Sequence, residues 1–257
     1  MKCGAYMTLM DYLKDSKNKR LVIGGHRGHQ SEVRENTIRN YAQLLGKNIP
    51  YVEIDVQLTK DDQIVIFHDS KLETGTSLSG EIRGYSLEAL RQSFEIDTAA
   101  DTIVWCKEHH MGIAFELKTQ VLQSLPERRT VAEQLAELIA KNGFYQDCFV
   151  FGKDYETLSI IKSLDQRIHI GVIAPANPEE ALPLMERLGA FLYLDYLEGF
   201  TEPLVRQLHE AGCFLDGSVV NTEEALKEAL RLGVDMVESD EPEKILAILK
   251  KIKEGED

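Results

Sequence analysis

Two short runs of this 257-residue chain place charged residues where buried strands are expected. In Val52-Glu53-Ile54-Asp55-Val56 the carboxylates alternate with aliphatic residues, so Glu53 and Asp55 point to one side of the strand. Glu116 and Lys118 share a side in the second run. Unpaired buried carboxylates are costly, so a cation must compensate them. Glu53, Asp55 and Glu116 on adjacent strands would suit one divalent cation, Mg²⁺ or Ca²⁺, because such hard cations prefer oxygen ligands.

Two histidines stand at the ends of candidate strands and could carry protons. His26 is followed by Arg27, and His68 ends the run Ile66-Phe67-His68. Histidine is the side chain best suited to acid/base chemistry near neutral pH. The alternative is that the carboxylates only form a salt-bridge network with Arg27 and Lys118, but the presence of two histidines favours chemistry. A structural role is expected for the other histidines, which are His29, His109, His110, His169 and His209.

The elements that must position these residues alternate along the chain. Apolar or β-branched runs predict strands at Leu21–Gly25, Tyr51–Leu58, Gly112–Leu117, Cys148–Phe151, His169–Ile173, Ala190–Leu194, Cys213–Asp216 and Asp235–Glu238. Helical spacing follows at Thr37–Leu45, Thr98–His109, Glu127–Lys141, Tyr155–Ser163, Pro178–Leu188, Glu202–Ala211, Thr222–Leu232 and Pro242–Lys253. Eight β-α units are the number that closes a parallel barrel.

A doubly wound sheet would also alternate strands and helices. It usually carries a phosphate-binding loop with G-x-G-x-x-G spacing, and Gly24-Gly25-His26-Arg27-Gly28 lacks that spacing. The (β/α)8 TIM barrel is therefore favoured, as a single domain over residues 1–257. An insertion at about residues 63–96, between the second and third strands, interrupts the simple repeat. Loops at that position build the active sites of barrels.

The composition limits the partners. Lys and Arg number 29 against 43 Asp and Glu, so the net charge is −14, and a broad surface for nucleic acid or anionic lipid is not expected. No run approaches the roughly 18 apolar residues of a membrane span, and the start is unlike a signal peptide, so no stable membrane anchor is expected. The scattered cysteines, Cys3, Cys106, Cys148 and Cys213, predict buried, reduced thiols in a cytoplasmic protein.

The motifs together resemble the glycerophosphodiester phosphodiesterase family. The resemblance is carried by His26-Arg27-Gly28, Glu35-Asn36-Thr37, Glu53-x-Asp55 with the residues up to Asp61, Val65-x-x-His68-Asp69 and Glu116-x-Lys118. It continues more weakly through Gly233-Val234-Asp235 and Asp240-x-Pro242. It implies a TIM barrel with a small insertion, a divalent metal, and hydrolysis of a glycerophosphodiester to glycerol 3-phosphate and an alcohol.

The resemblance also implies residue roles. The metal would be held by Glu53, Asp55 and Glu116, while His26 and His68 would be the general acid/base pair. Arg27 and Lys118 would bind phosphate oxygens. Which histidine acts as the acid is left open, as is the choice between direct attack by water and a cyclic phosphate formed by the glycerol 2-hydroxyl. Glu35 is expected near this site, Asp69 is expected to orient His68, and Asn36 or Thr37 to cap the following helix.

Three departures from the family pattern concern substrate choice. Arg34 stands where proline is usual, Gly152-Lys153-Asp154 replaces Ser-Phe-Asp, and Ser218-Val219-Val220-Asn221 replaces Trp-Thr-Val-Asn. Two aromatic walls of the glycerol pocket are thus replaced by Lys153 and Ser218. Lys153 is predicted to bind substrate and to favour a second anionic or polyhydroxyl group; the alternative is an exposed loop lysine.

The leading functional prediction is a metal-dependent enzyme acting on deacylated phospholipid head-group esters, a small-molecule phosphodiester substrate. One alternative is a lysophospholipase D-like phosphodiesterase, which would need an apolar groove or a membrane-binding surface. The other is a barrel that binds phosphodiesters without turnover. Such a barrel has no need of two proton carriers, which argues against it. The sequence leaves the oligomeric state open.

Overall fold

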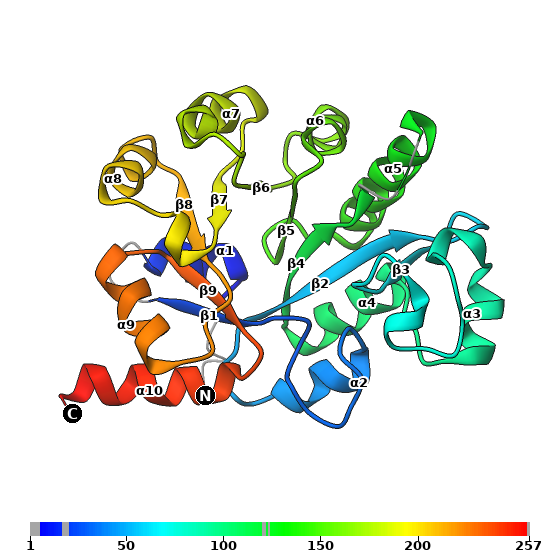
Figure 1. The fold of residues 1–257 in the computed structure, drawn as a ribbon, viewed down its shortest axis with the longest axis horizontal. Helices are drawn as coiled ribbons and strands as arrows, with labels where there is room; N and C mark the ends of the chain where they lie inside the picture. Colours follow the sequence, from blue (N-terminus) through cyan, green and yellow to red (C-terminus); the bar gives the residue numbers. More distant parts are fainter. Residues whose placement is uncertain (1–5, 17–20, 120–121, 123, 256–257) are drawn as a thin grey trace.

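The strands form a closed parallel barrel. The computed structural model describes residues 6–16, 21–119, 122 and 124–255, and eight parallel strands close the barrel within them (Figure 1). They are β1 (Val22–Gly25), β2 (Tyr51–Leu58), β4 (Gly112–Leu117), β5 (Cys148–Gly152), β6 (Ile170–Ile173), β7 (Leu192–Asp195), β8 (Phe214–Gly217) and β9 (Met236–Ser239). Each predicted strand has a counterpart whose ends differ by two residues at most. The barrel prediction is confirmed.

Closure depends on β1, which pairs with the strands before and after it around the barrel. Its Gly25 pairs with Val52 of β2, and its Val22 pairs with Met236 of β9. The first and last strands of the chain are therefore neighbours. Because all eight strands run parallel, their carboxyl ends meet at one mouth.

Helices surround the strands in the described part of the chain. They are α2 (Ile38–Tyr41), α4 (Ala99–His109), α5 (Leu125–Asn142), α6 (Tyr155–Leu164), α7 (Ala181–Leu188), α8 (Glu202–Glu210), α9 (Glu223–Leu232) and α10 (Pro242–Glu254). Thr37 caps α2 by accepting a hydrogen bond from the Asn40 backbone N–H. The predicted helix Thr37–Leu45 is shorter than expected, because after Tyr41 the chain tightens into a 3₁₀ turn over Ala42–Leu44.

An insertion follows β2 and lies to one side of the barrel (Figure 1). Strand β3 (Ile64–Ile66) pairs antiparallel with the end of β2, and two 3₁₀ turns (Leu72–Thr74 and Ile82–Gly84) lead into α3 (Leu87–Ser93). These elements enclose their own apolar cluster, which consists of Val65, Phe67, Leu72, Ile82, Leu90 and Ile96. The separate cluster gives His68, at the start of the insertion, a rigid support.

The opposite end of the barrel is closed by α1 (Leu9–Ser16), a helix that the sequence pattern did not predict. Leu9 and Leu13 are fully buried against the barrel interior, where they join Tyr51 and Phe149 in one apolar cluster. Both Tyr51 and Gly112 begin a strand, and Leu9 lies close to Gly112. The apolar end of the interior is thus sealed, and its polar groups lie toward the other mouth.

The cysteines that the structure describes are buried, as expected from the sequence. Cys106, Cys148 and Cys213 are buried, and burial raises the pKa of Cys106 and Cys148; Cys3 lies outside the described residues. Trp105 packs against the core and stacks on His109.

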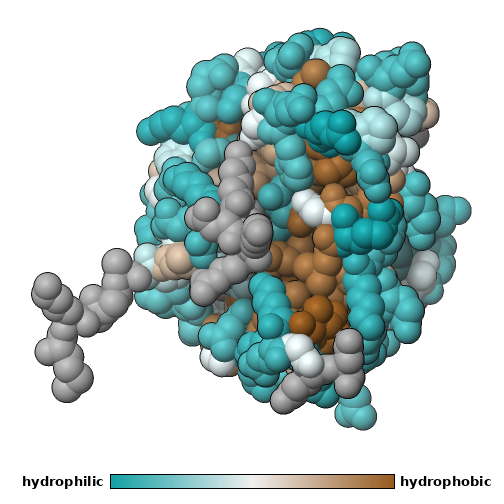
Figure 2. Space-filling model, turned by 90° about the vertical axis from the view of Figure 1, so that its left-hand side faces the viewer, coloured by the Kyte–Doolittle hydropathy of each residue, from teal (hydrophilic) through white to brown (hydrophobic). Residues whose placement is uncertain are grey.

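No helix among the described residues is both long and apolar enough to cross a bilayer. Figure 2 shows a face that is hydrophilic over most of its area, with an elongated hydrophobic hollow at its centre.

Candidate active site

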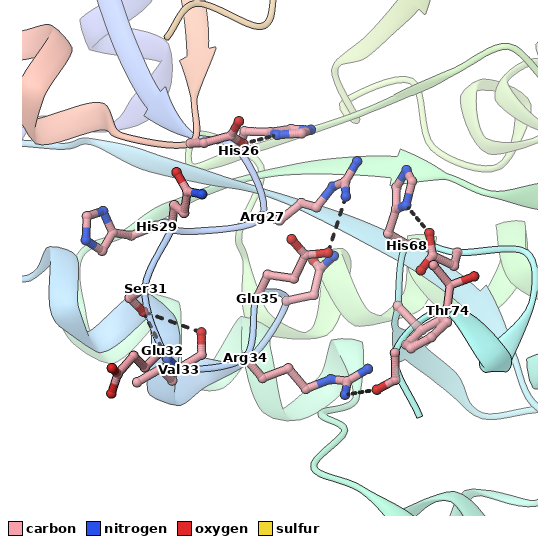
Figure 3. A pocket seen from close by; sticks show the side chains of 16 residues that line it. His26, Arg27, His29, Ser31, Glu32, Val33, Arg34, Glu35, His68 and Thr74 are labelled. Atoms are coloured by element: carbon pink, nitrogen blue, oxygen red, sulfur yellow. Dashed lines mark hydrogen bonds and ion pairs between the residues drawn. The ribbon is translucent and has the colours of Figure 1, made fainter. Parts of the chain in front are cut away.

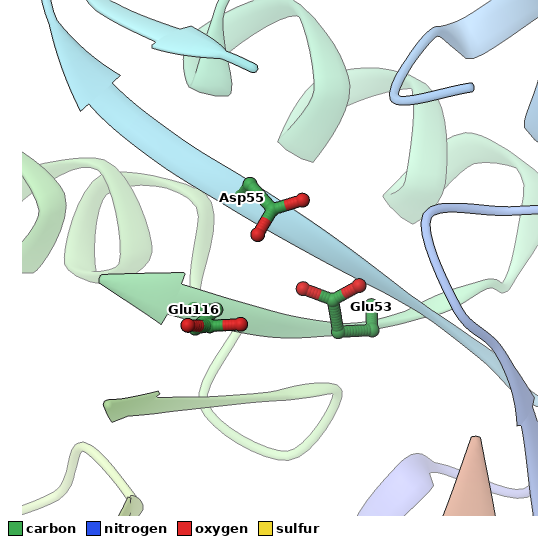
Figure 4. Close-up of side chains that lie close together, drawn as sticks. All are labelled: Glu53, Asp55 and Glu116. Atoms are coloured by element: carbon green, nitrogen blue, oxygen red, sulfur yellow. The ribbon is translucent and has the colours of Figure 1, made fainter. Parts of the chain in front are cut away.

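The predicted metal-ligating residues come together at the carboxyl ends of two neighbouring strands. Strand pairing sets Asp55 of β2 directly beside Glu116 of β4, and Glu53 lies one step deeper on the same face of β2. Oxygen atoms of the three carboxylates all lie within 4.8 Å of one another (Figure 4). Glu53 and Asp55 are each 1% exposed. The three carboxylates form a group that could hold a metal ion.

Two cations partly neutralise this acidic group. Lys118 Nζ lies 3.0 Å from Asp55 Oδ1 and donates to Glu116 Oε1 at 2.7 Å. Arg27 Nε lies 3.5 Å from Asp55 Oδ2, and the Arg27 backbone N–H donates to Glu53 Oε2 at 3.0 Å. The salt-bridge network considered from the sequence is therefore present. It is incomplete, however, because the buried Glu53 Oε1 has no hydrogen-bond partner in the described structure.

The pKa shifts reflect this imbalance. Burial raises the pKa of Glu53 well above its usual range, and the charges of Asp55 and Glu116 raise it further. Burial acts in the same direction on Asp55, but the neighbouring Lys118, His68 and Arg27 outweigh it and lower the pKa of that carboxyl. A group of three carboxylates in which Glu53 Oε1 has neither a hydrogen bond nor an ion pair among the described residues fits a divalent cation, which would remove the cost of burying the Glu53 charge.

The loop after β1 is shaped to bring Arg27 to the carboxylates. Arg27 has a φ of +53° and Gly28 a φ of +100°, and a Cβ atom on Gly28 would lie 2.2 Å from Asn40 Oδ1. Only glycine fits there. Asn36, also at positive φ (+57°), donates from Nδ2 to Asp55 Oδ2 at 2.7 Å. Asn40 ties the loop together by accepting from the His29 N–H at 2.8 Å. The sequence motifs did not predict these roles for Asn36 and Asn40.

Each of the two predicted acid/base histidines is held by a carboxylate. His68 Nδ1 lies 2.8 Å from Asp69 Oδ1, as expected for an orienting role of Asp69. His26 Nδ1 lies 2.7 Å from Asp240 Oδ1, and Asn221 Nδ2 donates to the other oxygen of Asp240 at 2.6 Å. The hydrogen bond with His26 lowers the pKa of Asp240. In the sequence Asp240 stood out only as part of a motif; its position directly after β9 is the signal that could have identified its role.

A cavity of about 630 Å³ lies between the β1–α2 loop and the insertion (Figure 3). Arg27 points into it from the loop and lies 3.2 Å from Glu35 through Nη1 and Oε1. Arg34, which replaces the usual proline, joins the two walls. Its guanidinium lies 4.7 Å from the centre of the Phe94 ring, and Nη1 donates to the Gly75 carbonyl at 3.1 Å. This residue therefore fastens the loop to the insertion.

A second cavity, of about 350 Å³, opens over the barrel centre and shares His26, Arg27 and His68 with the first. It also contains Glu116 and Lys118 in its wall, together with Lys153 and Ser218. Lys153 is exposed, whereas Ser218 is buried. His26, Arg27 and His68 therefore lie between the two cavities and line both, whereas Glu53 and Asp55 are not among the residues that line either one.

Two buried acids that the sequence motifs did not reveal are Glu238, in the wall of the second cavity, and Asp216 behind it. Glu238 lines this cavity, and Ser218 Oγ donates to Asp216 Oδ1 while accepting from the Glu238 backbone N–H at 2.8 Å. Burial raises the pKa of Asp216 to about 7 and the pKa of Glu238 well above its usual range. A signal was present for Glu238, because it directly follows the apolar pair Met236-Val237 at the end of the last predicted strand.

Comparison with known proteins assigns the chain to a family. Residues 26–244 match the family model described as the Glycerophosphoryl diester phosphodiesterase family. The chain belongs to this family. A glycerophosphodiester phosphodiesterase from Bacillus altitudinis is 26% identical over 246 residues, which cover 90% of this chain and 99% of that protein. The resemblance drawn from the motifs is confirmed, and so is the prediction of an enzyme of this class.

Two further similar proteins are a solved phosphodiesterase and a lysophospholipase D. An Oleispira antarctica phosphodiesterase, solved with the product sn-glycerol-3-phosphate, superposes with a TM-score of 0.82 at 24% identity. The match covers 91% of this chain and 99% of that chain. A lysophospholipase D from Mus musculus is 28% identical over 122 residues, which are 46% of this chain and 37% of that protein.

The carboxylate of Asp240 should be needed to orient His26. We expect Asp240→Asn to lower kcat by roughly tenfold or more, because the amide changes the hydrogen bond that holds the imidazole. Glu241→Gln is the matched control, since the neighbouring Glu241 pairs with Lys244 instead. Steady-state kinetics on a glycerophosphodiester measure both variants. Equal kcat values for the two would refute an orienting role.

Proposed function

We propose that the protein hydrolyses glycerophosphodiesters, such as glycerophosphocholine or glycerophosphoethanolamine, to glycerol 3-phosphate and an alcohol, and that it needs one divalent cation. The observation that carries this proposal is the buried acidic group beside two separately oriented histidines. Glu53, Asp55 and Glu116 together with an orphaned oxygen favour a cation site. His26 and His68 line the same cavities.

In this proposal Glu53, Asp55 and Glu116 hold the cation, Mg²⁺ or Ca²⁺. When bound, such a cation supplies positive charge next to the phosphoryl oxygens. The chain's own contribution is Arg27 and Lys118, whose side chains lie beside the same carboxylates. We expect them to bind the non-bridging oxygens of the phosphodiester, because a guanidinium and an ammonium stabilise the negative charge that accumulates there as a nucleophile adds.

Proton transfer falls to His26 and His68. One imidazole takes a proton from the attacking hydroxyl, of water or of the glycerol 2-position, as its oxygen bonds to phosphorus. The other gives a proton to the departing alkoxide as the bond between phosphorus and that oxygen breaks. Attack by water gives glycerol 3-phosphate directly; attack by the 2-hydroxyl gives a cyclic phosphate, which water then opens by adding to phosphorus as the bond to the 2-oxygen breaks and that oxygen regains its proton. Asp240 and Asp69 hold the Nδ1 atoms, at 2.7 and 2.8 Å, so the Nε2 atoms are left for these transfers.

The test of this function is an assay with and without metal. Purified protein is given glycerophosphocholine and a lysophospholipid, first with EDTA and then with Mg²⁺, Ca²⁺ or Mn²⁺ restored. We expect hydrolysis of glycerophosphocholine that is lost on chelation and returns with metal. Hydrolysis of the lysophospholipid alone would replace this function by the lysophospholipase D-like one. Equal inactivity on both diesters with every metal would leave the barrel as a binding protein.

The two histidines provide a second check on the same chemistry. His26→Ala and His68→Ala should each lower kcat by roughly 10²-fold, the usual scale for a general acid/base group. His109→Ala is the control, because His109 is exposed and stacks on Trp105. A variant at position 26 or 68 that keeps nearly full kcat would exclude that residue as a proton carrier.

Cation binding should weaken as the pH falls. The pKa of Glu53 is raised by burial and by Asp55 and Glu116, so this carboxyl takes up a proton at a higher pH than an exposed glutamate. A cation must displace that proton, and its affinity can fall by up to about tenfold per pH unit for each proton displaced. Calorimetric titration with Ca²⁺ between pH 8 and pH 6 measures this. Glu53→Gln should bind weakly throughout, whereas the exposed Glu137→Gln should follow the unmodified protein; an unchanged affinity across the range would contradict the site.

Lys153 is proposed to bind substrate at the mouth of the smaller cavity. Its position supports this, because it is exposed and lines that cavity together with Lys118. Lys153→Ala should raise KM for a substrate with a second anionic or polyhydroxyl group, with little change in kcat. Lys141→Ala, at the exposed end of α5, is the control. If KM of Lys153→Ala matches that of the control, Lys153 is only a loop lysine.

A further inference from the structure

Glu238 is a buried carboxyl group to which the proposed mechanism gives no task. It lies on β9, is 3% exposed, and its side chain lines the 350 Å³ cavity together with His26, Glu116 and Lys118. Its Oε1 atom has no hydrogen-bond partner in the described structure. A buried oxygen without a hydrogen-bond partner destabilises the fold. Because this oxygen belongs to a residue in a cavity wall, its position points to a partner on a bound ligand.

Two neighbouring polar groups, Ser218 and Asp216, do not supply that partner. Ser218 Oγ donates to Asp216 Oδ1 and accepts the Glu238 backbone N–H, so this hydroxyl is already engaged. Asp216 is itself a fully buried carboxyl group, and its charge repels that of Glu238. The group that completes Glu238 must therefore bring a hydrogen-bond donor. A carboxyl group accepts such a bond whether or not it carries a proton.

The sizes of the two cavities limit which part of the substrate can bring a hydrogen-bond donor to Glu238. The two cavities meet at His26, Arg27 and His68, so a phosphodiester bound between the histidines can place one ester group in each cavity. The larger cavity, of about 630 Å³, leaves room for alcohols of different size. The smaller one suits a three-carbon unit, and its wall carries the charged groups of Lys153 and Asp195. Apolar side chains, among them Leu194 and Val219, complete the wall.

We propose that Glu238 is a specificity residue that accepts a hydrogen bond from the free terminal hydroxyl of the substrate's glycerol unit. This inference rests on the proposed function. It makes a free hydroxyl a condition for tight binding, because without it the buried carboxyl loses its partner. A glycerol unit acylated at that position has no hydroxyl there and cannot donate this hydrogen bond. The enzyme is thereby restricted to deacylated substrates.

Two phosphocholine esters test the assignment. Glycerophosphocholine carries both hydroxyls, and 2-hydroxypropyl phosphocholine lacks only the terminal one, so the 2-hydroxyl remains available for chemistry. The choline group has no donor in either. The unmodified enzyme should prefer glycerophosphocholine in kcat/KM by roughly tenfold or more, chiefly through KM. Glu238→Leu should reduce the preference to about twofold or less. Glu238→Gln should keep part of it, because the amide oxygen still accepts.

Asp216→Asn is the matched control, because Asp216 is buried beside Glu238 and is not among the residues that line the cavity. It should keep the preference of the unmodified enzyme even if stability changes. Equal kcat/KM for the two esters in the unmodified enzyme would overturn the role of Glu238, as would an undiminished preference in Glu238→Leu. If Glu238→Leu does not fold, the unmodified enzyme and Glu238→Gln still decide. Failure to hydrolyse either ester with any metal would instead overturn the proposed function, and the assignment of Glu238 with it.

Discussion

Buried negative charge at the mouth of the barrel governs how the surrounding parts of the molecule are built. Glu53 and Asp55 are almost wholly removed from water, and Glu116 lies beside them. Lys118 and Arg27 compensate this charge only in part. Removing a carboxylate from water costs several kcal/mol unless it is paired. The site is therefore preorganised for a further positive charge, and the surrounding loops hold the partial compensation in place.

This arrangement reconciles an acidic protein with an anionic substrate. The net charge of −14 disfavours polyanions and anionic surfaces, because such partners meet the field of the whole molecule. A small phosphodiester meets only the local field. At the mouth, the guanidinium of Arg27 and the ammonium of Lys118 already face the acidic group, and a bound cation would make the region positive. In the proposed function, local charge and not net charge decides which phosphate compounds the site admits.

The same mouth is asymmetric. On one side, the β1–α2 loop and the insertion enclose the larger cavity, and Arg34 fastens the two together. On the other side, the later strands contribute a smaller cavity with buried acids. His26 and His68 stand between the two, each held by a carboxylate from its own side of the barrel. The rigid support of each histidine comes from a different part of the fold, the last strand for His26 and the insertion for His68.

Features that depend on neighbours along the chain could be predicted from the sequence, whereas contacts between distant residues could not. Alternation along a strand puts Glu53 and Asp55 on one face, and the spacing of apolar residues predicts the strands and most helices, because both effects act over a few residues. The ordered motifs indicated the family.

The short helix α1 was not predicted, because its few apolar residues are stabilised only by packing against the barrel interior. The bond between His26 and Asp240 joins residues 214 positions apart, and it exists because β1 pairs with β9 when the barrel closes. The orphaned oxygen of Glu238 is likewise invisible in the sequence, since being unpartnered is a property of the surroundings. Strand periodicity tells which face a side chain takes, but closure of the barrel determines which groups that face meets.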